Sequence, residues 1–291
     1  MRILVTGATG FVGRHVVAAL AGHEVFATTR GRHRGHPTPA HVEWLDVNLS
    51  EGLDTAKLPR RMDAILHLAQ SDRYREFPAG APDVFRVNVD VPAQLMLWAK
   101  TAGVSRAVFA STGTVYEPFS GPMHEMAAVA PTGYYGASKL ACETLTLPFQ
   151  SADLSVAHMR IFFVYGPGQG NSMIARIMDN VRGGQPVTLP KSGDGLLFAP
   201  TYVADTARVL VQACIEGWRG VWNLASPHAI SMHDFITAVG QAAGRSPVVQ
   251  LTEQAPPLPI VPDLAKLGAR LDVASFVKPA EGIKRTLVAS A

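Results

Sequence analysis

Short apolar runs alternate with longer helical patterns through the first half of the chain. The runs are partly β-branched, which is typical of buried strands, and they cover residues 3–5, 24–28, 42–45, 64–67, 107–110 and 155–160. Apolar residues recur at helical spacing over residues 12–20, 81–102 and 135–149. Strands that alternate with helices predict βαβ units, and therefore a parallel sheet with right-handed crossovers.

The second half of the chain has a less regular pattern. Helical spacing continues over residues 171–180, 203–215 and 231–243, but glycine and proline become frequent after Arg182. A proline-rich stretch follows at residues 256–262. These features indicate a smaller and more irregular lobe.

The composition limits the class of protein. The chain has 291 residues, of which 47% are hydrophobic and 17% charged, which excludes a disordered chain and allows a large two-sided core. No apolar run reaches the ~18 residues of a membrane span, and the first residues lack the layout of a signal peptide. The two cysteines, Cys142 and Cys214, lie far apart, so we expect a cytoplasmic protein with neither a disulfide framework nor a zinc site.

A glycine-rich loop lies between the first predicted strand and the first predicted helix. Gly7, Gly10 and Gly13 form a G-x-x-G-x-x-G pattern. In such a loop one glycine makes the tight turn, one lets the backbone approach a pyrophosphate, and one lets the helix pack on the strand. The N-terminus of the helix offers unpaired N–H groups to the phosphates. The loop therefore predicts a dinucleotide-binding site.

The end of the second predicted strand bears on which dinucleotide binds. NAD sites usually carry an acid there that accepts hydrogen bonds from the ribose, but this chain has Arg30, followed by the basic residues Arg32, His33, Arg34 and His36. Guanidinium groups bind phosphate with bidentate geometry. The cluster therefore favours the 2′-phosphate of NADP, with NAD as the alternative, over a nucleic-acid surface. Asp46, at the end of the third strand, is placed to hydrogen-bond adenine.

A tyrosine and a lysine lie four residues apart at the start of a predicted helix. Tyr135 and Lys139 therefore share one helix face. A tyrosine has a pKa near 10 and is a poor base at neutral pH unless a nearby cation favours its phenolate. We expect Lys139 to supply that cation.

These motifs together resemble the extended branch of the short-chain dehydrogenase/reductase superfamily, the NAD(P)-dependent sugar epimerase/dehydratase family. The resemblance rests on the glycine loop, Asp46, Asn88, the segment 109–116 and the Tyr135/Lys139 pair, in this order, and runs from Met1 to about Leu224. It implies an α/β fold: a Rossmann-type doubly wound parallel sheet with a small C-terminal α/β substrate lobe.

The resemblance also implies how the chain is divided and assembled. Residues 1–165 would form the NAD(P)-binding Rossmann domain, with returning segments near 201–225, and residues 166–291 would mainly form the substrate-binding lobe. The family often forms homodimers through helices that correspond to residues 81–102 and 135–149, so a homodimer is expected.

The resemblance assigns roles to individual residues. Tyr135 would exchange a proton with the substrate hydroxyl, Lys139 would lower its pKa and bind the nicotinamide ribose, and Thr112 would orient the substrate oxygen. Asn88 would support the Lys139 region through the backbone or water. The implied cofactor-binding residues are Gly7, Thr9, Gly10, Phe11, Val12, Arg30, Asp46, Val47, Leu68, Ala69, Gln70, Asn88, Tyr135, Lys139 and Ile161. The implied substrate-binding residues are Ser111, Thr112, Gly113, Phe163 and Phe198.

The sequence departs from the family in three places. Gly113 and Thr114 follow Thr112 where family dehydratases carry an Asp-Glu pair, which argues against dehydration. Phe163 stands in place of an Asn, and the segment 196–200 lacks an Arg, and both of these family residues bind the substrate diphosphate. We therefore expect a less anionic or differently clamped substrate. Lys191 and Arg176 are the remaining candidate phosphate partners, although each is better explained as a surface charge.

The sequence predicts an NAD(P)-dependent enzyme that acts on a secondary hydroxyl or ketone of a sugar-like or nucleotide-sugar-like small molecule. Two chemistries stay open: epimerisation through a transient ketone, and net NADPH-dependent reduction of a non-nucleotide ketone. A non-catalytic dinucleotide sensor or scaffold on the same fold is the third hypothesis, although such proteins commonly lose the Tyr or Lys retained here. No metal is expected, because His33, His36 and His41 lack matching acids or cysteines.

Overall fold

The computed structural model describes residues 1–31, 39–121, 123–170 and 172–289. The chain forms two compact units, of which unit 1 contains Met1–Pro118, Ala128–Arg160 and Ala207–Trp222, and unit 2 contains Phe119–Ala127, Ile161–Thr206 and Asn223–Ala291. The sequence prediction placed a boundary at residue 165, with segments near 201–225 returning to the first domain. Within the described residues, no helix is both long and apolar enough to cross a membrane.

A seven-stranded sheet forms the centre of unit 1. Its strand order is β11-β6-β5-β4-β1-β2-β3, and the described pairs β1–β2, β2–β3, β1–β4 and β4–β5 are all parallel. The strands are β1 (Arg2–Thr6), β2 (Glu24–Thr29), β3 (Val42–Asp46), β4 (Ala64–His67), β5 (Arg106–Thr112), β6 (Ser155–Ile161) and β11 (Gly220–Leu224). The predicted Rossmann-type α/β fold is therefore confirmed.

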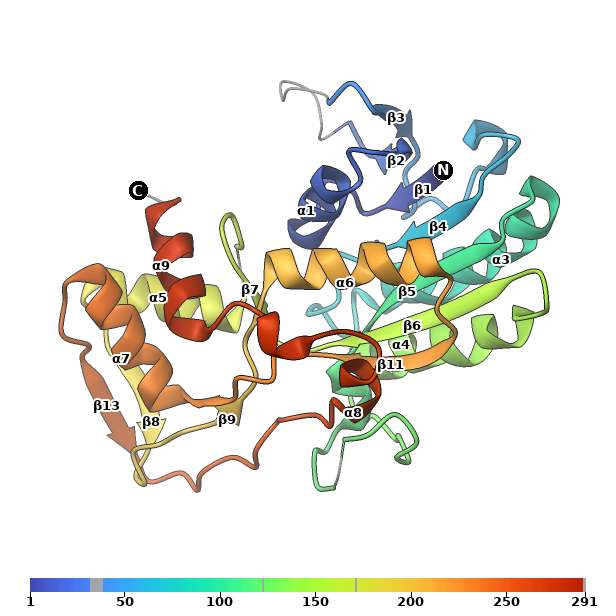
Figure 1. Ribbon diagram of the computed structural model, residues 1–291. Coiled ribbons are helices and arrows are strands. Elements are labelled where there is room, and N and C mark those ends of the chain that lie inside the picture. Colours follow the sequence, from blue (N-terminus) through green and yellow to red (C-terminus); the bar gives the residue numbers. More distant parts are fainter. Residues whose placement is uncertain (32–38, 122, 171, 290–291) are drawn as a thin grey trace. The chain divides into compact units, whose positions relative to one another are not determined.

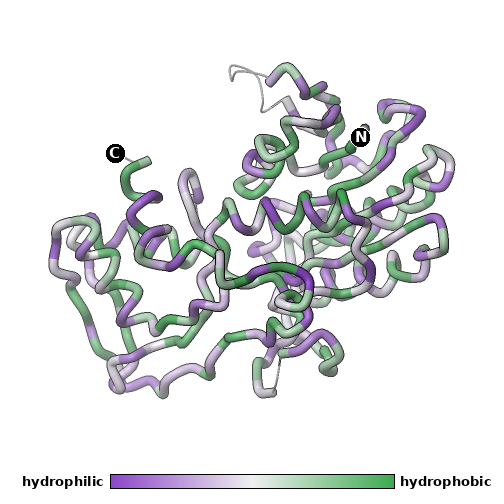
Figure 2. The backbone as a smooth tube through the Cα atoms, in the orientation of Figure 1, coloured by the Kyte–Doolittle hydropathy of each residue, from purple (hydrophilic) through white to green (hydrophobic). Residues whose placement is uncertain are grey.

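Helices cover both faces of this sheet (Figure 1). Helix α1 (Phe11–Ala19) and helix α6 (Val203–Glu216) lie on one face, and helices α3 (Val91–Ala102) and α4 (Tyr134–Thr146) pack together on the other. Helix α6 shows purple and green in alternation in Figure 2, as expected for a helix with one face on a sheet and one in solvent.

The predicted helix over residues 81–102 is wrong in one respect. It consists of α2 (Ala81–Phe85), one π-helical segment (Arg86–Asp90) and α3 (Val91–Ala102). A π turn adds a residue to the helical repeat and is frequent at functional sites. Here it contains Asn88, which is 1% exposed. Trp98 and Met96 lie in the apolar core on α3.

The glycine loop follows β1, which is the strand at which the strand order of the sheet reverses. The chain proceeds from β1 outward to β3 and then returns to β4 on the other side of β1. In open α/β sheets, ligands bind beyond the carboxyl ends of the strands at such a switch point. Thr6 at the end of β1 is in register with His67 at the end of β4, so the segments that follow these two residues are neighbours.

Unit 2 has short strand pairs and an apolar core. Its elements are β7 (Val164–Tyr165), α5 (Met173–Gly183), β8 (Val187–Pro190), β9 (Leu197–Phe198), β10 (Thr201–Tyr202), β12 (Ile230–Ser231), α7 (Met232–Ala243), β13 (Val249–Thr252), α8 (Ala265–Gly268) and α9 (Pro279–Val288). Tyr165, Phe198 and Phe235 meet edge-to-face at ring-centroid distances of 5.5 to 6.1 Å. These rings fill the centre of the unit.

Candidate active site

The glycine loop lies against the backbone that follows β4. Gly7 has a φ of +70°, and a Cβ atom there would lie 2.7 Å from the Ala69 nitrogen. A Cβ at Gly13 would lie 2.1 Å from the Gly7 carbonyl oxygen. No side chain fits at either position, because the backbone of the loop packs directly on the residues after β4 and on the start of α1. Gly10 is the N-cap of α1, and its N–H donates to the Gly7 carbonyl at 2.9 Å.

The residues after β4 are fixed by side chains from other elements. The Thr6 hydroxyl is hydrogen-bonded to His67 Nδ1 at 2.8 Å. The Ser71 N–H donates to Asn88 Oδ1 at 3.1 Å, and Asn88 Nδ2 donates to the Ser138 hydroxyl at 3.0 Å. Asn88 was expected to support the Lys139 region through the backbone or water. In the structure, its side chain bonds directly to the hydroxyl of the residue before Lys139.

Tyr135, Lys139 and Thr112 lie at the carboxyl end of β5 and the start of α4. The Tyr135 hydroxyl donates to Gln70 Oε1 at 3.0 Å, and the Thr112 hydroxyl donates to the Thr114 hydroxyl at 3.0 Å. The Lys139 ammonium is 4% exposed and donates to the carbonyl of Ala110 at 3.0 Å. Helix α4 therefore directs Lys139 to the backbone of β5 and Tyr135 to the residue after Ala69, beyond the end of β4.

The electrostatics of Tyr135 differ from the sequence expectation. Burial raises the pKa of Tyr135 to about 12, only partly offset by the Thr112 side chain. Burial also lowers the pKa of Lys139, against the opposing influence of Cys142 and Glu143. The Lys139 ammonium is bound to the Ala110 carbonyl, and a lowering of the Tyr135 pKa by Lys139 stays a prediction. In this state Tyr135 is a phenol and can act as an acid.

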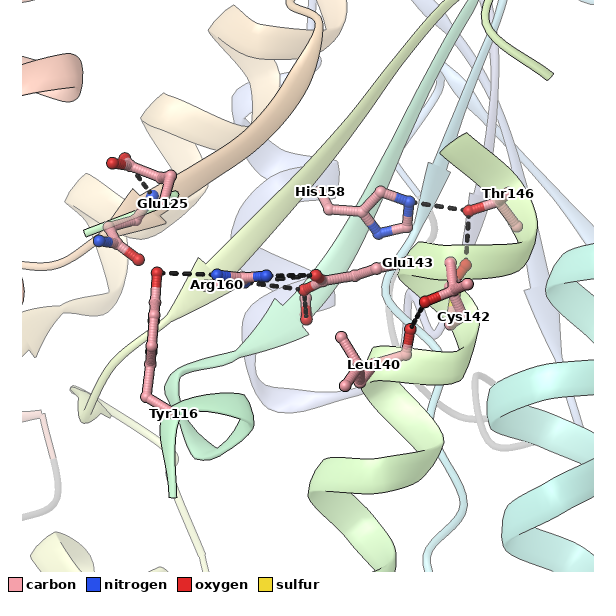
Figure 3. Close-up of polar contacts among 11 residues, drawn as sticks. Tyr116, Glu125, Leu140, Cys142, Glu143, Thr146, His158 and Arg160 are labelled. Carbon is pink, nitrogen blue, oxygen red and sulfur yellow. Dashed lines mark hydrogen bonds and ion pairs between the residues drawn. The ribbon is translucent and has the colours of Figure 1, made fainter. Parts of the chain in front are cut away.

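A buried ion pair braces the end of β5 against α4 and β6. Arg160 Nη2 lies 2.7 Å from Glu143 Oε2, with the two side chains 4% and 3% exposed. Arg160 Nη1 donates to the Tyr116 hydroxyl at 2.8 Å, and the Ser111 hydroxyl donates to Glu143 Oε1 at 2.5 Å. Figure 3 shows Arg160 between Tyr116 and Glu143. Four polar groups are thus satisfied together, as buried charges require.

Sequence reasoning missed this ion pair. Two signals could have found it: Glu143 is one helical turn beyond Lys139 on the same face, and Arg160 lies in an otherwise apolar strand. A charged residue in a fully buried strand is rarely unpaired. The ion pair also bears on the predicted role of Ser111 in substrate binding, because the Ser111 hydroxyl donates its hydrogen bond to Glu143.

Arg30 has an acidic partner from a different part of the chain. Arg30 Nη2 lies 2.6 Å from Asp72 Oδ2, and both side chains are partly exposed. Asp72 follows β4, so an acid does stand beside the end of β2 even though the β2 segment carries none. Asp46 is exposed at the end of β3. The other members of the basic cluster, Arg32, His33, Arg34 and His36, lie outside the described residues.

Several predicted site residues belong to unit 2. Phe163 has a φ of +41°, and its ring lies 5.2 Å from that of Phe198. Phe198 is 0% exposed and packs in the aromatic core of unit 2, and its assignment to substrate binding stays a prediction. Lys191 is exposed and paired with Glu253 at 2.9 Å, and Arg176 is exposed on α5. Ile161 is the first residue of its segment of unit 2.

The remaining predicted positions surround the glycine loop and the strand ends. Thr9, Phe11 and Val12 belong to the loop and the first turn of α1, Val47 follows β3, and Leu68 and Ala69 follow β4. Gly113 lies in the 3-10 turn after β5, where the Thr114 N–H donates to the Thr112 hydroxyl oxygen at 3.2 Å. Among the described residues, no cluster of three or more His, Cys, Asp or Glu side chains could hold a metal.

The fold and the site together define a class of protein. A doubly wound sheet, a glycine loop at its switch point, and a half-buried Tyr135 with a buried Lys139 next to the Thr112 strand end are the arrangement of an extended short-chain dehydrogenase/reductase. Residues 3–225 match the NAD dependent epimerase/dehydratase family, and the chain belongs to that family. The family assignment made from the sequence is confirmed.

Three of the similar proteins are UDP-glucose 4-epimerases or were solved with a UDP-sugar. A UDP-glucose 4-epimerase of Azospirillum brasilense is 35% identical over 150 residues, which cover 50% of this chain and 43% of the relative. The structure of MoeE5 in complex with UDP-glucose and NAD is 28% identical, covers 100% of this chain and 98% of its own, and has a TM-score of 0.84. The Thermus thermophilus UDP-glucose 4-epimerase complex with NAD is 29% identical, with 99% and 98% coverage and a TM-score of 0.80.

Proposed function

We propose that this protein is an NAD(P)-dependent epimerase of a nucleotide sugar, which inverts a carbon that carries a secondary hydroxyl. The observation that carries the proposal is the arrangement of Tyr135, Thr112 and the buried Lys139 at the end of β5 and the start of α4. Membership of the family and full-length likeness to the UDP-glucose complex of MoeE5 support the same reaction.

The glycine loop fits a dinucleotide. Gly7 and Gly13 let the loop pack tightly against the residues after β4 and against the first turn of α1, and Gly10 leaves the N-terminus of α1 without a side-chain cap where phosphates would approach. Asp46 and Val47 would contact the adenine, while Lys139 would bind the nicotinamide ribose. A bound nicotinamide supplies the acceptor and donor of hydride for the reaction.

The residues of this chain supply the proton chemistry. Tyr135, as phenolate, would accept the proton of the substrate hydroxyl when the ketone forms, and as phenol would return it when the ketone is reduced on the opposite face. Thr112 would hold the same oxygen. Lys139 would bind the nicotinamide ribose, and a positive charge near the Tyr135 hydroxyl would favour its phenolate.

The cofactor preference is proposed to be a modest one for NADP, with NAD also accepted. Arg30 is placed to bind a 2′-phosphate, which supports NADP. Its ion pair with Asp72 opposes that preference, because the carboxylate neutralises the guanidinium and would repel the phosphate. The similar proteins MoeE5 and the Thermus thermophilus epimerase were solved with NAD.

The proposed substrate is a nucleotide sugar whose diphosphate is held differently from the family pattern. Phe163 occupies the position of the family Asn, and its ring contacts Phe198. Lys191 is paired with Glu253 at the surface and is a poor candidate for the missing arginine. Dehydration is not proposed, because Gly113 and Thr114 stand in place of the Asp-Glu pair.

Net ketone reduction is the second candidate, and the Arg30 side chain favours it, because NADPH is the usual reducing pool. The two reactions differ in their cofactor balance. Incubation with UDP-glucose and either cofactor, followed by proton NMR of the sugar, should show a second epimer with no net change in absorbance at 340 nm. Loss of NADPH in proportion to a ketone substrate, without epimer formation, would favour the reductase instead.

We further propose a homodimer through α2, α3 and α4 of unit 1. Phe85, Leu97 and Leu145 lie on these helices with 55%, 61% and 48% of their surface exposed, and a dimer through the helices would cover these apolar side chains. Light scattering should give twice the chain mass, and Leu97→Glu should give the monomer.

The buried free thiols Cys142 and Cys214 support a reducing compartment such as the cytoplasm.

A further inference from the structure

The Tyr135 hydroxyl has a partner that neither the Tyr-x-x-x-Lys motif nor the β5 motif supplies. Its phenol donates to Oε1 of Gln70 at 3.0 Å. Gln70 precedes Tyr135 by 65 residues and follows the end of β4. In the sequence, Gln70 was assigned to cofactor binding only through its position after His67. In the structure, the Gln70 side chain contacts the Tyr135 hydroxyl, the group proposed to exchange the substrate proton.

The backbone on both sides of Gln70 is held in place. The Ala69 N–H donates to the Thr6 hydroxyl at 3.4 Å, and Ala69 lies so close to Gly7 that a Cβ there would clash. On the other side, the Ser71 N–H donates to Asn88 Oδ1 at 3.1 Å, and the Ser71 hydroxyl donates to Asp83. The amide therefore reaches Tyr135 from an ordered segment, which is what a precise contact to a reacting group requires.

A carboxamide suits a residue that gains and loses a proton. Its oxygen accepts a hydrogen bond from the phenol, and after a 180° rotation of the amide its NH2 group can donate to the phenolate. A hydrogen bond to the neutral form opposes ionisation, and one to the charged form favours it. In the structure the oxygen faces Tyr135, so Gln70 stabilises the acid form.

We propose that Gln70 is a positioning residue for Tyr135: its amide holds the phenol beside Thr112 and sets the pH at which Tyr135 exchanges its proton. The inference rests on the proposed function for the reaction that this proton serves. It deepens that function by placing part of the control of the acid-base group on the loop after β4.

Few other titratable groups face the hydroxyl. The Tyr74 ring lies 5.0 Å from the Tyr135 ring and carries Arg75 on its face, also at 5.0 Å. On α4 the nearest charge is Lys139, which is bound to Ala110. On β4 the nearest titratable group is His67, which burial keeps neutral with a pKa of about 3. The end of β5 and the turn after it bring the hydroxyls of Thr112 and Thr114.

Two substitutions at Gln70 should move the Tyr135 titration in opposite directions. Gln70→Met removes the acceptor, so the pKa of Tyr135 should fall by roughly 0.5–1 unit, the equivalent of one net hydrogen bond. Gln70→Glu places a carboxylate beside the developing phenolate, so the pKa should rise by about 1 unit or more. Gln150→Glu is the matched control, because it adds the same charge at an exposed position after α4.

The titration is read in two ways. Phenolate absorbance at 295 nm after a rapid pH jump, with each variant compared with its Tyr135→Phe double variant, reports Tyr135 without substrate or cofactor. The acid limb of kcat/KM for epimerisation reports the same group in turnover. Both readouts should move down in pH for Gln70→Met, up for Gln70→Glu, and not at all for Gln150→Glu.

The outcomes separate this inference from the proposed function. If the wild type interconverts sugar epimers and neither readout moves in the Gln70 variants, the role of Gln70 is wrong. If the absorbance titration moves while the wild type turns over no nucleotide sugar, the proposed function fails and the coupling between Gln70 and Tyr135 stands. Equal thermal stability of the variants and the wild type excludes a folding effect as the cause of a shift.

Discussion

The two units use their buried side chains differently around the residues expected to be functional. In unit 1, Lys139, Glu143 and Arg160 are almost fully buried, and each has a hydrogen-bond or ion-pair partner. In unit 2, Phe163 stands where the family pattern has a polar residue, and it packs against the buried ring of Phe198. The buried polar contacts of unit 1 hold the proposed acid–base residues in place, whereas the buried rings of unit 2 pack against one another.

This difference explains why the family motifs predict the function of unit 1 better than that of unit 2. A buried polar residue must keep its partner, so a motif such as Tyr135 and Lys139 comes with a whole set of contacts. An aromatic core tolerates substitution as long as volume is kept. The reaction type is therefore better constrained by unit 1 than the identity of the sugar is by unit 2.

The largest loss of stability is expected from breaking the buried ion pair of unit 1. Glu143→Ala leaves Arg160 as an uncompensated buried charge, which typically costs about 3–5 kcal/mol. It also frees the Ser111 hydroxyl next to Thr112, so activity should fall with stability. The free energy of unfolding from urea titration checks this. Glu281→Ala, which removes the exposed partner of Arg285 in unit 2, is the control and should leave the midpoint unchanged.

A cavity in unit 2 should cost slightly less and should leave cofactor binding intact. Phe198→Ala removes a fully buried ring, a change that costs about 3 kcal/mol when neighbours relax in part, and the partly exposed Phe163 can do so. Dinucleotide affinity by fluorescence titration should stay at the wild-type value, because Phe198 belongs to unit 2. A loss of dinucleotide affinity as large as that of Gly7→Ala would show that Phe198 is not a core residue of unit 2 alone.

Acid should weaken unit 1 through its buried histidines. Burial lowers the pKa of His158 to about 3, below the ordinary 6.5, so the folded state holds it neutral. The stability that follows is complete above pH 6.5 and is lost as pH falls towards 3, because the unfolded chain binds the proton first. Between pH 7 and pH 5 the wild type should lose about 2 kcal/mol more than His158→Gln. Parallel curves for the two proteins would contradict this assignment.

Two exposed ion pairs should give the smallest effects and should differ between the units. Arg30→Ala, at the dinucleotide end of β2, should weaken NADP binding about tenfold, or roughly 1.4 kcal/mol, and leave NAD binding nearly unchanged. Asp72→Asn should strengthen NADP binding. Lys191→Ala, which breaks the exposed pair with Glu253, should change neither. A stronger preference of the wild type for NAD that persists in Asp72→Asn would overturn the role given to Arg30.

The fold of the central sheet could be predicted in large part from local pattern. The first six strands are apolar runs between glycines and polar turns, and each is found in the structure within two residues of its predicted ends. The seventh, β11 (Gly220–Leu224), was not assigned as a strand, because it starts at a glycine and contains Trp222 and Asn223, so no alternation is visible. The π turn around Asn88 was missed because one added residue hardly changes helical periodicity.

The site could be predicted as a set of residue types but not as a set of contacts. Tyr135, Lys139 and Thr112 follow from their spacing and from the family resemblance. The bonds of Tyr135 to Gln70 and of Arg30 to Asp72 join residues 65 and 42 positions apart in the chain. Such contacts depend on the order of strands in the sheet and on loop conformation, which single-sequence patterns do not report.

The measurement that tests the central claim most directly is epimer interconversion by Tyr135→Phe. Removal of one hydroxyl leaves the ring packing and the glycine loop in place, so cofactor affinity should be retained. Loss of general acid–base catalysis should lower kcat by a factor of about 10²–10⁴. If Tyr135→Phe interconverts a nucleotide sugar at the wild-type rate, Tyr135 is not the group that exchanges the substrate proton, and the proposed mechanism is wrong.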